Sequence, residues 1–411
     1  MIKIQNQKSR SNKESCCGCG ACAAVCPNHC IEMKEDEEGF LYPEVNAERC
    51  VQCERCTRSC PCEKSNQDQG YSKSGLKKQF PLAYGGWHTD EAILGQSSSG
   101  GAFSLFAERI IEMGGVVYGC AVNQKAEVFH QGVRSREDLQ RLRKSKYVQS
   151  TLGNVFKEIE EALKKGSLVL FAGTPCECEA IHGYLARPYD NLYLCDFICH
   201  GVPSPKVFRD WVGFLEDKYH DTFQNISFRI KDAGWHSSGL QSGTRTFFAK
   251  RTRTHIPAFF DKFMNGFLEN IYLRPSCHEC RFKGERIHTD ITIADFWGIK
   301  KLDKTMSHRK GTSLVLINSE KGKRLFDMSC ASFHYRQYEP EKALRYNVSY
   351  FRSAPEHPER AAFFEDYFQR GIAYAMKKYT QPWHWVLYMM LYRKGRLSSA
   401  KGSGRNGKQK I

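Results

Sequence analysis

The pattern of apolar and polar positions predicts a domain in which strands and helices alternate from about residue 82 onward. Short apolar runs predict strands at residues 82–87, 116–122, 168–171, 192–194, 289–294 and 312–318. Helical spacing and helix end signals predict helices at residues 102–113, 135–143, 155–165, 257–270 and 355–377, and one that starts at 319. The alternation predicts an α/β arrangement, which places ligands at strand ends.

Two cysteine runs with one spacing, C-x2-C-x2-C-x3-C-P, begin at Cys16 and at Cys50. Three thiolates from one tight loop suit a 4Fe-4S cubane, and in the bacterial two-cluster pattern the last cysteine of each run binds the other cluster. The runs therefore predict two 4Fe-4S clusters. We assign one to Cys16, Cys19, Cys22 and Cys60, and the other to Cys50, Cys53, Cys56 and Cys26.

Zinc sites and disulfides also use paired cysteines, but neither fits these runs. Zinc takes spacings such as C-x2-C with a distant pair. A disulfide framework requires an exported chain, whereas residues 1–10 are polar and contain no apolar signal core. Residues 12–65 resemble bacterial two-cluster ferredoxins, and residues 31–45, with an acidic turn at 35–39, fit the hairpin between cluster motifs.

Length and composition predict more than one domain in this chain of 411 residues. We expect a two-cluster ferredoxin-like module at 1–65, a polar linker at 66–80, a main domain at 81–335, a helical region at 336–392 and a basic disordered tail at 393–411. Residues 383–391 are strongly apolar but too short to span a bilayer.

The basic residues Arg393, Lys394 and Arg396 follow that apolar stretch. They are compatible with a weak peripheral membrane contact, or with a helix that folds against the core, which we favour.

Charge and cysteine content exclude some classes of protein. The formal net charge is +16, yet the basic residues are scattered among acidic ones and form no aromatic-interleaved stripe, so we expect no nucleic-acid partner. An oxidised four-thiolate cubane carries a net charge of about −2 and a flavin pyrophosphate about −2 more, which offsets part of the excess. The 19 cysteines suit a strongly reducing cytoplasm, where we expect the protein to act.

Four further cysteines follow predicted strands or helices. Cys176 and Cys199 lie in loops after two successive strands, and Cys277 and Cys280 form a C-x2-C pair after the aromatic helix at 257–270. These four either complete a third cluster site or are buried structural cysteines, because free cysteine is among the most buried residues.

A Ser/Gly-rich loop precedes the helix at 102–113 and contains Ser98, Ser99, Gly100 and Gly101. Free backbone N–H groups at a helix N-terminus can bind an anion, although a plain helix cap explains such a loop equally well. The basic turn at 144–150 includes Lys146 and Tyr147, which could face a phosphate and an aromatic ring, or could simply be solvated. Trp297, with Phe296, either walls a ligand pocket or forms a buried aromatic corner.

Six ordered segments make the chain resemble the beta subunit of coenzyme F420-reducing hydrogenase and formate dehydrogenase, with a fused two-cluster ferredoxin module. The segments are residues 98–101, 144–150, 173–176, 198–204, 274–283 and 290–298. The resemblance implies an α/β domain that binds FAD and a third 4Fe-4S cluster and exchanges hydride with a deazaflavin. Glu177 and Cys178 depart from the family pattern after Cys176, so Cys178 or Cys195 could replace one of the four ligands.

We therefore expect a mixed α+β and α/β fold, with a two-cluster ferredoxin-like module, a larger mixed-sheet flavin-binding domain and a helical C-terminus. The expected function is that of an iron–sulfur flavin oxidoreductase, which relays electrons between a low-potential donor, the clusters and FAD and exchanges hydride with coenzyme F420 or another small-molecule acceptor. Its partner would be a redox protein or a hydrogenase- or dehydrogenase-type subunit. The alternative is an electron-transfer subunit with no substrate of its own. Residues 98–101, Lys146, Tyr147 and Trp297 are the candidate flavin contacts.

Overall fold

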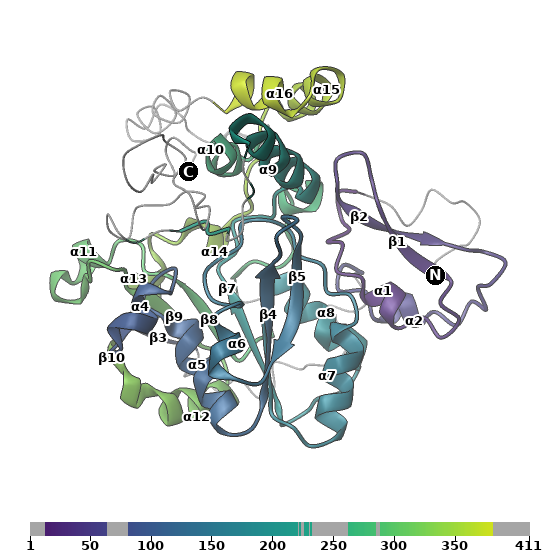
Figure 1. Cartoon of the computed structure of the whole chain (residues 1–411). Helices are drawn as coiled ribbons and strands as arrows, with labels where there is room; N and C mark the ends of the chain where they lie inside the picture. The colour runs from purple at the N-terminus through teal and green to yellow at the C-terminus, as the bar shows by residue number, and fades with distance from the viewer. Residues whose placement is uncertain are drawn as a thin grey trace, which may run out of the picture.

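The structure is a computed structural model that describes residues 13–63, 81–220, 222, 226–229, 231, 262–284 and 288–380. A small N-terminal module lies beside a larger unit built on one mixed sheet (Figure 1). The predicted linker at 66–80, the apolar stretch at 383–391 and the basic tail at 393–411 lie outside the described residues.

The N-terminal module is a two-stranded hairpin with two single-turn helices. Strands β1 (Ile31–Glu35) and β2 (Leu41–Val45) pair antiparallel, and helices α1 (Ala21–Ala24) and α2 (Arg55–Arg58) each lie within one cysteine run. The predicted acidic turn joins the strands, and the side chain of Asp36 accepts a hydrogen bond from Phe40 N at 2.9 Å. The hairpin expected between the two cluster motifs is therefore present.

The larger unit contains an eight-stranded sheet in the order β10-β3-β9-β8-β7-β6-β4-β5. Its strands are β3 (Leu82–His88), β4 (Val116–Val122), β5 (Val128–Val133), β6 (Val169–Gly173), β7 (Leu192–Phe197), β8 (Ile291–Asp295), β9 (Ser313–Ile317) and β10 (Phe333–Tyr338). Strands β4, β6, β7 and β8 run parallel, and β3 points the same way because two antiparallel pairings separate it from β8. Their carboxyl ends meet at one side, which we name the carboxyl edge.

All six predicted strands are present, and β5 and β10 are additional antiparallel strands at the two ends of the sheet. The helices of the larger unit are α4 (Glu91–Gly95), α5 (Ala102–Glu112), α6 (Arg136–Leu139), α7 (Val155–Lys164), α8 (Pro175–Leu185), α9 (Pro205–Tyr219), α10 (Lys262–Leu268), α11 (Ile299–Leu302), α12 (Glu320–Ser329), α13 (Pro340–Leu344), α14 (Val348–Phe351), α15 (Arg360–Arg370) and α16 (Ile372–Tyr379). Among the described residues, short 3-10 helices lie at Pro275–Cys277, Lys304–Met306 and Cys330–Ser332.

Helices cover both faces of the sheet because successive strand residues point to opposite sides. Val117 and Leu170 pack with apolar residues of α5 and α12, whereas their neighbours Val116 and Val169 pack with α7 and α8. Figure 1 shows these helices on the two sides of the strands. The three-layer arrangement confirms the predicted α/β class and leaves the carboxyl edge open to loops.

Helices α9, α10, α15 and α16 form a separate apolar cluster above the carboxyl edge (Figure 1). The prediction of a single helix at 355–377 was wrong. The helix breaks at Gly371, whose φ of 82° and ψ of 167° are not helical, and α16 then packs back on α15. The predicted helix at 135–143 is also shorter and reduces to the single turn of α6.

Candidate functional site

All nineteen cysteines lie in the described residues and are free thiols. In the first predicted ligand set, Cys16 lies near Cys60 and Cys19 lies near Cys22. The structure thus brings the last cysteine of the second run to the first run, as the crossed assignment requires.

In the second set, Cys26 packs with Cys50 and Cys56 around Ile31, while Cys53 lies exposed on the same loop. Among the described residues, no three His, Cys, Asp or Glu side chains converge closely enough to hold a single metal ion. A cubane distributes its four thiolates over four irons, so its ligands need not converge on one point. The chemistry and grouping of these thiols fit a 4Fe-4S cluster, and the assignment of individual ligands stays a prediction.

The four cysteines proposed for a third cluster line one small pocket at the carboxyl edge. Cys176 lies in the first turn of α8, Cys199 follows β7, and Cys277 and Cys280 lie in and just after the 3-10 turn Pro275–Cys277. Burial raises the pKa of Cys199 to about 12 and that of Cys277 to about 11. These thiols would therefore keep their protons until metal binding displaced them. Four thiols that line one pocket suit a cubane.

Neither Cys178 nor Cys195, the alternatives considered for this set, lines the pocket. Cys178 packs between α7, α8 and the sheet, and Cys195 packs on the opposite face with α5 and α12. Glu177, the other departure from the family pattern, belongs to the α8 capping box and accepts hydrogen bonds from Thr174 and from Ser150 Oγ at 2.6 Å. Both departures therefore have structural roles in the core.

The segment after α13 closes the outer side of this pocket. Cys280 N donates to Ser353 Oγ at 2.9 Å, and Lys283 Nζ donates to Ser349 O at 3.0 Å and to the carbonyl of Cys199. His200 Nε2 lies 2.6 Å from Asn270 Oδ1, and burial lowers the pKa of His200. This places His200 in a structural role beside the pocket.

The N-terminal module contacts the larger unit through the fully buried Arg274. Its guanidinium donates to Cys16 O at 2.7 Å, to Leu41 O at 2.9 Å and to Gln149 Oε1 at 3.0 Å, and it lies 4.3 Å from the centre of the Tyr42 ring. In the sequence, Arg274 stands out only as the first residue of the segment at 274–283 that carries the family resemblance. An arginine is rarely fully buried, so nothing local in the sequence indicates this role.

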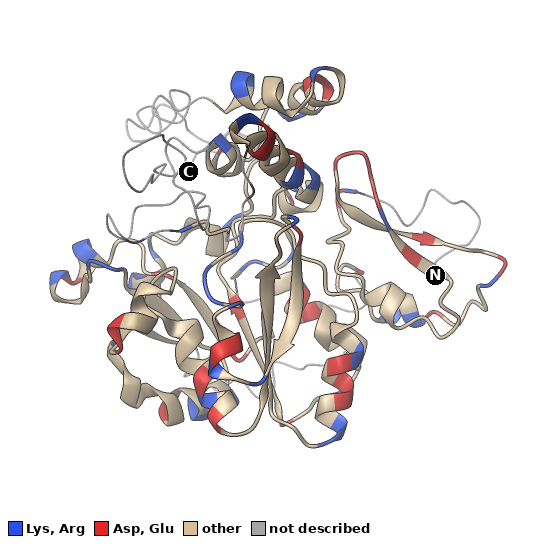
Figure 2. Ribbon diagram, in the orientation of Figure 1, with Lys and Arg blue, Asp and Glu red and all other residues tan. Residues whose placement is uncertain are grey.

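The acidic hairpin turn makes a second contact with the larger unit. Glu38 pairs with both terminal nitrogens of Arg360 at the start of α15, and Arg209 of α9 donates to Glu35 Oε1 at 2.7 Å. Figure 2 shows this acidic turn, in red, beside basic residues of α9.

The predicted flavin contacts gather at another part of the carboxyl edge, between β3, β8 and the turn before Tyr147. Ser98 Oγ accepts from Ser145 N at 2.7 Å, and Ser98 O accepts from Arg229 Nη1 at 3.1 Å. Arg229 also forms a two-point ion pair with Asp295 at 3.0 and 2.6 Å. The loops at 98–101, 144–147 and 295–297 are thus connected through Arg229, which sequence reasoning missed.

Within this group, three residues already have protein partners. Lys146 Nζ donates to the carbonyls of Arg141 and Arg143, and burial lowers the pKa of Lys146 to about 8. Ser99 Oγ donates to Thr312 O at 3.1 Å. A Cβ on Gly100 would lie 2.3 Å from Gly86 O, so this glycine is required by the packing of the loop on β3.

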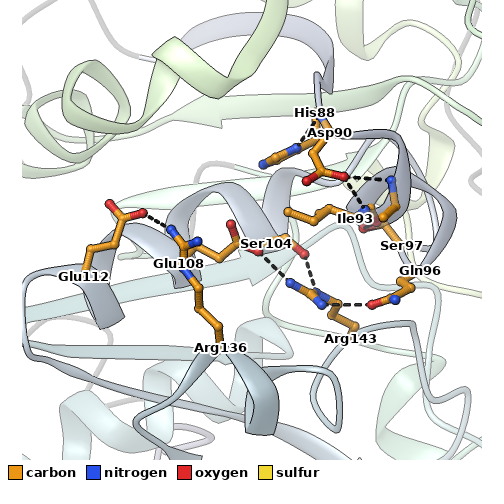
Figure 3. A network of polar contacts seen from close by, with 11 residues as sticks. His88, Asp90, Ile93, Gln96, Ser97, Ser104, Glu108, Glu112, Arg136 and Arg143 are labelled. Carbon is orange, nitrogen blue, oxygen red and sulfur yellow. Dashed lines mark hydrogen bonds and ion pairs between the residues drawn. The ribbon is translucent and has the colours of Figure 1, made fainter.

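Gly101 directly precedes α5 and has no side chain to cap this 11-residue helix. An N-terminus without a side-chain cap is an arrangement that can bind an anion such as a phosphate. Arg143 stabilises the start of the helix by donating to Ser104, Gln96 and Glu108 at 3.0, 2.9 and 2.6 Å (Figure 3). Phe296 is buried and meets Tyr338 edge-on, as an aromatic corner would, whereas Trp297 is 43% exposed.

Residues 166–340 match the family model for the C terminus of the coenzyme F420 hydrogenase/dehydrogenase beta subunit, and residues 15–64 match that of a 4Fe-4S dicluster domain. This match places the resemblance to the beta subunits in the larger unit. The match confirms the predicted family, and the 4Fe-4S dicluster match confirms that the N-terminal module is an iron–sulfur domain.

Curated relatives match different parts of the chain. The F subunit of the F(420)H(2) dehydrogenase of Methanosarcina mazei is 28% identical over 176 residues, which cover 40% of this chain and 47% of the relative. The coenzyme F420-dependent sulfite reductase of Methanocaldococcus jannaschii is 28% identical over 197 residues, which cover 47% of this chain and 29% of the relative. An uncharacterized ferredoxin of Methanocaldococcus jannaschii is 38% identical over 50 residues, which cover 12% of this chain and 64% of the relative. The chain thus spans less than two thirds of the length of each.

A solved structure of the F420-reducing [NiFe] hydrogenase complex from Methanosarcina barkeri aligns with 65% of this chain and 89% of the matched chain, at 16% identity and a TM-score of 0.44. None of the helices in the part of the chain that the structure describes is long and apolar enough to cross a membrane.

Proposed function

We propose that the chain is an iron–sulfur flavoprotein oxidoreductase that carries electrons between a low-potential redox protein and a small-molecule hydride acceptor. The observation that supports this most directly is the pocket lined by Cys176, Cys199, Cys277 and Cys280, against which the dicluster module is docked. When bound, the 4Fe-4S clusters supply one-electron storage and FAD supplies the change between single electrons and hydride.

The carboxyl edge supplies the residues that would hold FAD. The uncapped N-terminus of α5 would face the pyrophosphate, and the Arg229–Asp295 pair would keep the loops at 98–101 and 295–297 in place. Trp297, exposed beside that pair, would offer an aromatic surface to a planar ring. No general acid or base is required of these residues for hydride exchange.

Coenzyme F420 is the first candidate acceptor, because the printed names of two relatives refer to it. A reducing cytoplasm is the proposed location, since nineteen free thiols suit that compartment. The second candidate function is an electron-transfer subunit without its own substrate, which is supported by the limited share of those relatives that the chain covers.

The flavin test uses Arg229→Met, which removes the charge at the loop junction while keeping much of the side-chain volume. Purified wild-type protein should carry about one FAD per chain, and Arg229→Met should lose most of it while keeping its iron. Arg324→Met, at an exposed arginine of α12, is the matched control. Full flavin in Arg229→Met would remove this loop cluster from the FAD site, and wild-type protein with clusters but no flavin would favour the electron-transfer subunit.

The acceptor test offers coenzyme F420, NAD, NADP and free flavin to anaerobically reduced protein. Rapid bleaching of F420 alone is the expected result. Trp297→Ala should slow that reaction without loss of iron or FAD, because it removes the aromatic surface but none of the proposed cofactor ligands. An unchanged rate would exclude Trp297 from the acceptor site.

A further inference from the structure

A cavity of about 340 Å³ lies between the dicluster module and the larger unit. One wall comes from the module, at the first cysteine run, α1 and the hairpin. The other wall comes from the segment 151–154 and the first turn of α7, which lies beside α1 (Figure 1). The cavity shares no lining residue with the four-cysteine pocket and includes none of the proposed flavin contacts.

The size and the lining of this cavity are those of a small-molecule site. Ligand pockets in proteins have volumes of about 300–1,000 Å³, are mostly apolar and often lie at domain interfaces. The apolar side chains that line the cavity are Ala23, Ala24, Met33, Leu41, Leu152 and Phe156. Phe156 is only 1% exposed, so it is held by the core of the larger unit, whereas a methionine such as Met33 can adapt its shape to an aromatic ring. A ligand with a flat apolar body therefore fits.

The polar groups at the cavity favour a negative charge on the ligand. No Asp or Glu is among the described residues that line it, whereas Lys157 and His29 both do. Lys157 is exposed in the first turn of α7 and pairs with no carboxylate among the described residues. The side chain of Asn154 does not cap this 10-residue helix. A cation next to an uncapped helix start attracts an anion.

The first cluster of the dicluster module decides how such a ligand would be oriented. Cys19, one of its predicted ligands, lines the module wall of the cavity. An oxidised four-thiolate cubane carries a net charge of about −2 and repels an anion. We therefore expect the charged group of the ligand at Lys157, on the wall of the larger unit, and its apolar body against Ala24 and Met33 of the module.

We propose that this cavity binds a small aromatic anion and that the bound ligand holds the dicluster module against the larger unit. A ligand that touches both walls binds the docked arrangement more tightly than the released one, so its binding free energy adds to that of docking. The inference goes beyond the proposed function, because it requires neither the third cluster nor FAD.

The first experiment is a calorimetric titration of anaerobically reconstituted full-length protein with 2-naphthyl phosphate, which combines a planar apolar body with an anionic group. About one molecule should bind per chain. Inorganic phosphate lacks the apolar body and should bind at least a hundredfold more weakly. The neutral 2-naphthol lacks the charge and should bind at least fivefold more weakly.

Three variants locate the binding site. Lys157→Met removes the cation and should weaken binding of 2-naphthyl phosphate about fivefold. Lys165→Met is the matched control, because this exposed lysine follows the last residue of the same helix, and it should bind like wild type. Ala24→Phe places a ring in the cavity from the module side and should abolish binding while the iron content stays that of wild type.

The second experiment tests whether the ligand holds the modules together. At about 100 times its dissociation constant, 2-naphthyl phosphate should raise the urea midpoint of the cluster absorbance by about 1–3 M, and it should leave the midpoint of Ala24→Phe unchanged.

Four results would overturn the proposal. The first is no binding to the wild-type protein, and the second is equal affinity in Lys157→Met and Lys165→Met. The third is binding that persists in an iron-loaded Ala24→Phe. The fourth is binding without a shift of the absorbance midpoint, which would remove the role in docking. If Ala24→Phe lost iron, the two lysine variants would decide whether the ligand binds in this cavity.

Discussion

Replacement of Arg274 by alanine should release the dicluster module from the larger unit. The buried guanidinium donates to the carbonyls of Cys16 and Leu41 and to the side chain of Gln149, and each buried acceptor left without a donor costs about 1–3 kcal/mol. The lost contact with the Tyr42 ring adds about 0.5–2 kcal/mol. Water that enters the vacated space and the relief of a buried charge offset part of this, so we expect a net loss of about 3 kcal/mol.

Two spectroscopic probes can follow the two parts of the chain during urea unfolding under anaerobic conditions. Every tryptophan lies outside residues 1–63, so tryptophan fluorescence reports on the larger unit, while visible cluster absorbance includes the module. With a urea dependence of about 1–3 kcal/mol per molar, the expected loss moves the midpoint of the absorbance change down by about 1–3 M. The fluorescence midpoint should move less.

Arg274→Lys keeps the positive charge but not the planar arrangement of donors, so its midpoint should lie between those of wild type and Arg274→Ala. Arg324→Ala, at the exposed arginine of α12, should leave both midpoints unchanged. If the absorbance midpoint of Arg274→Ala coincided with that of Arg324→Ala, the reasoning that assigns Arg274 a central role in docking would be refuted.

Three further predictions concern other parts of the fold. Glu38→Ala leaves the nearly buried Arg360 without its carboxylate partner and should lower the free energy of unfolding by about 3 kcal/mol, measured by denaturant unfolding. In a double-mutant cycle with Arg360→Met, additive effects of the two substitutions would argue against a coupled pair. Burial raises the pKa of Asp196 to about 7. Between about pH 4 and 7 the folded chain therefore keeps a proton on Asp196 that the unfolded chain has released, so the free energy of unfolding should fall as pH rises through this range. Asp196→Asn should flatten that fall, and an unchanged pH profile would contradict the shift. Gly371→Ala should destabilise the fold by about 1–3 kcal/mol, because alanine is strained at the positive φ of this position. Gly213→Ala inside α9, where a Cβ would meet open space, should instead stabilise the fold by about 0.5–1 kcal/mol. If thermal unfolding showed Gly371→Ala to be the more stable of the two variants, this reasoning would be wrong.

The parts of the fold that follow local patterns could be predicted from the sequence. The apolar run at 168–171 became β6, and the three-layer arrangement follows from the alternation of such runs with helices. The sequence also contains two helix start signals. Thr174-Pro175 with Glu177 is a capping-box start for α8, and Ser204-Pro205 marks the start of α9.

Long-range placement could not be predicted in the same way. The sequence placed Cys176 and Cys199 at successive strand ends, but it contained nothing that set their distance from Cys277 and Cys280, which depends on how the chain returns after α10. The burial of Arg274 depends on the docking of two modules, and no local periodicity encodes that contact.

The pocket of four cysteines is the centre of the account, and the iron content of the wild-type chain tests it most directly. After anaerobic reconstitution, iron and acid-labile sulfide should each reach about twelve per chain, from three cubanes, and Cys277→Ala should fall to about eight. A wild-type value of about eight, unchanged in Cys277→Ala, would show that only the dicluster module binds clusters and would contradict the proposed electron path through the larger unit.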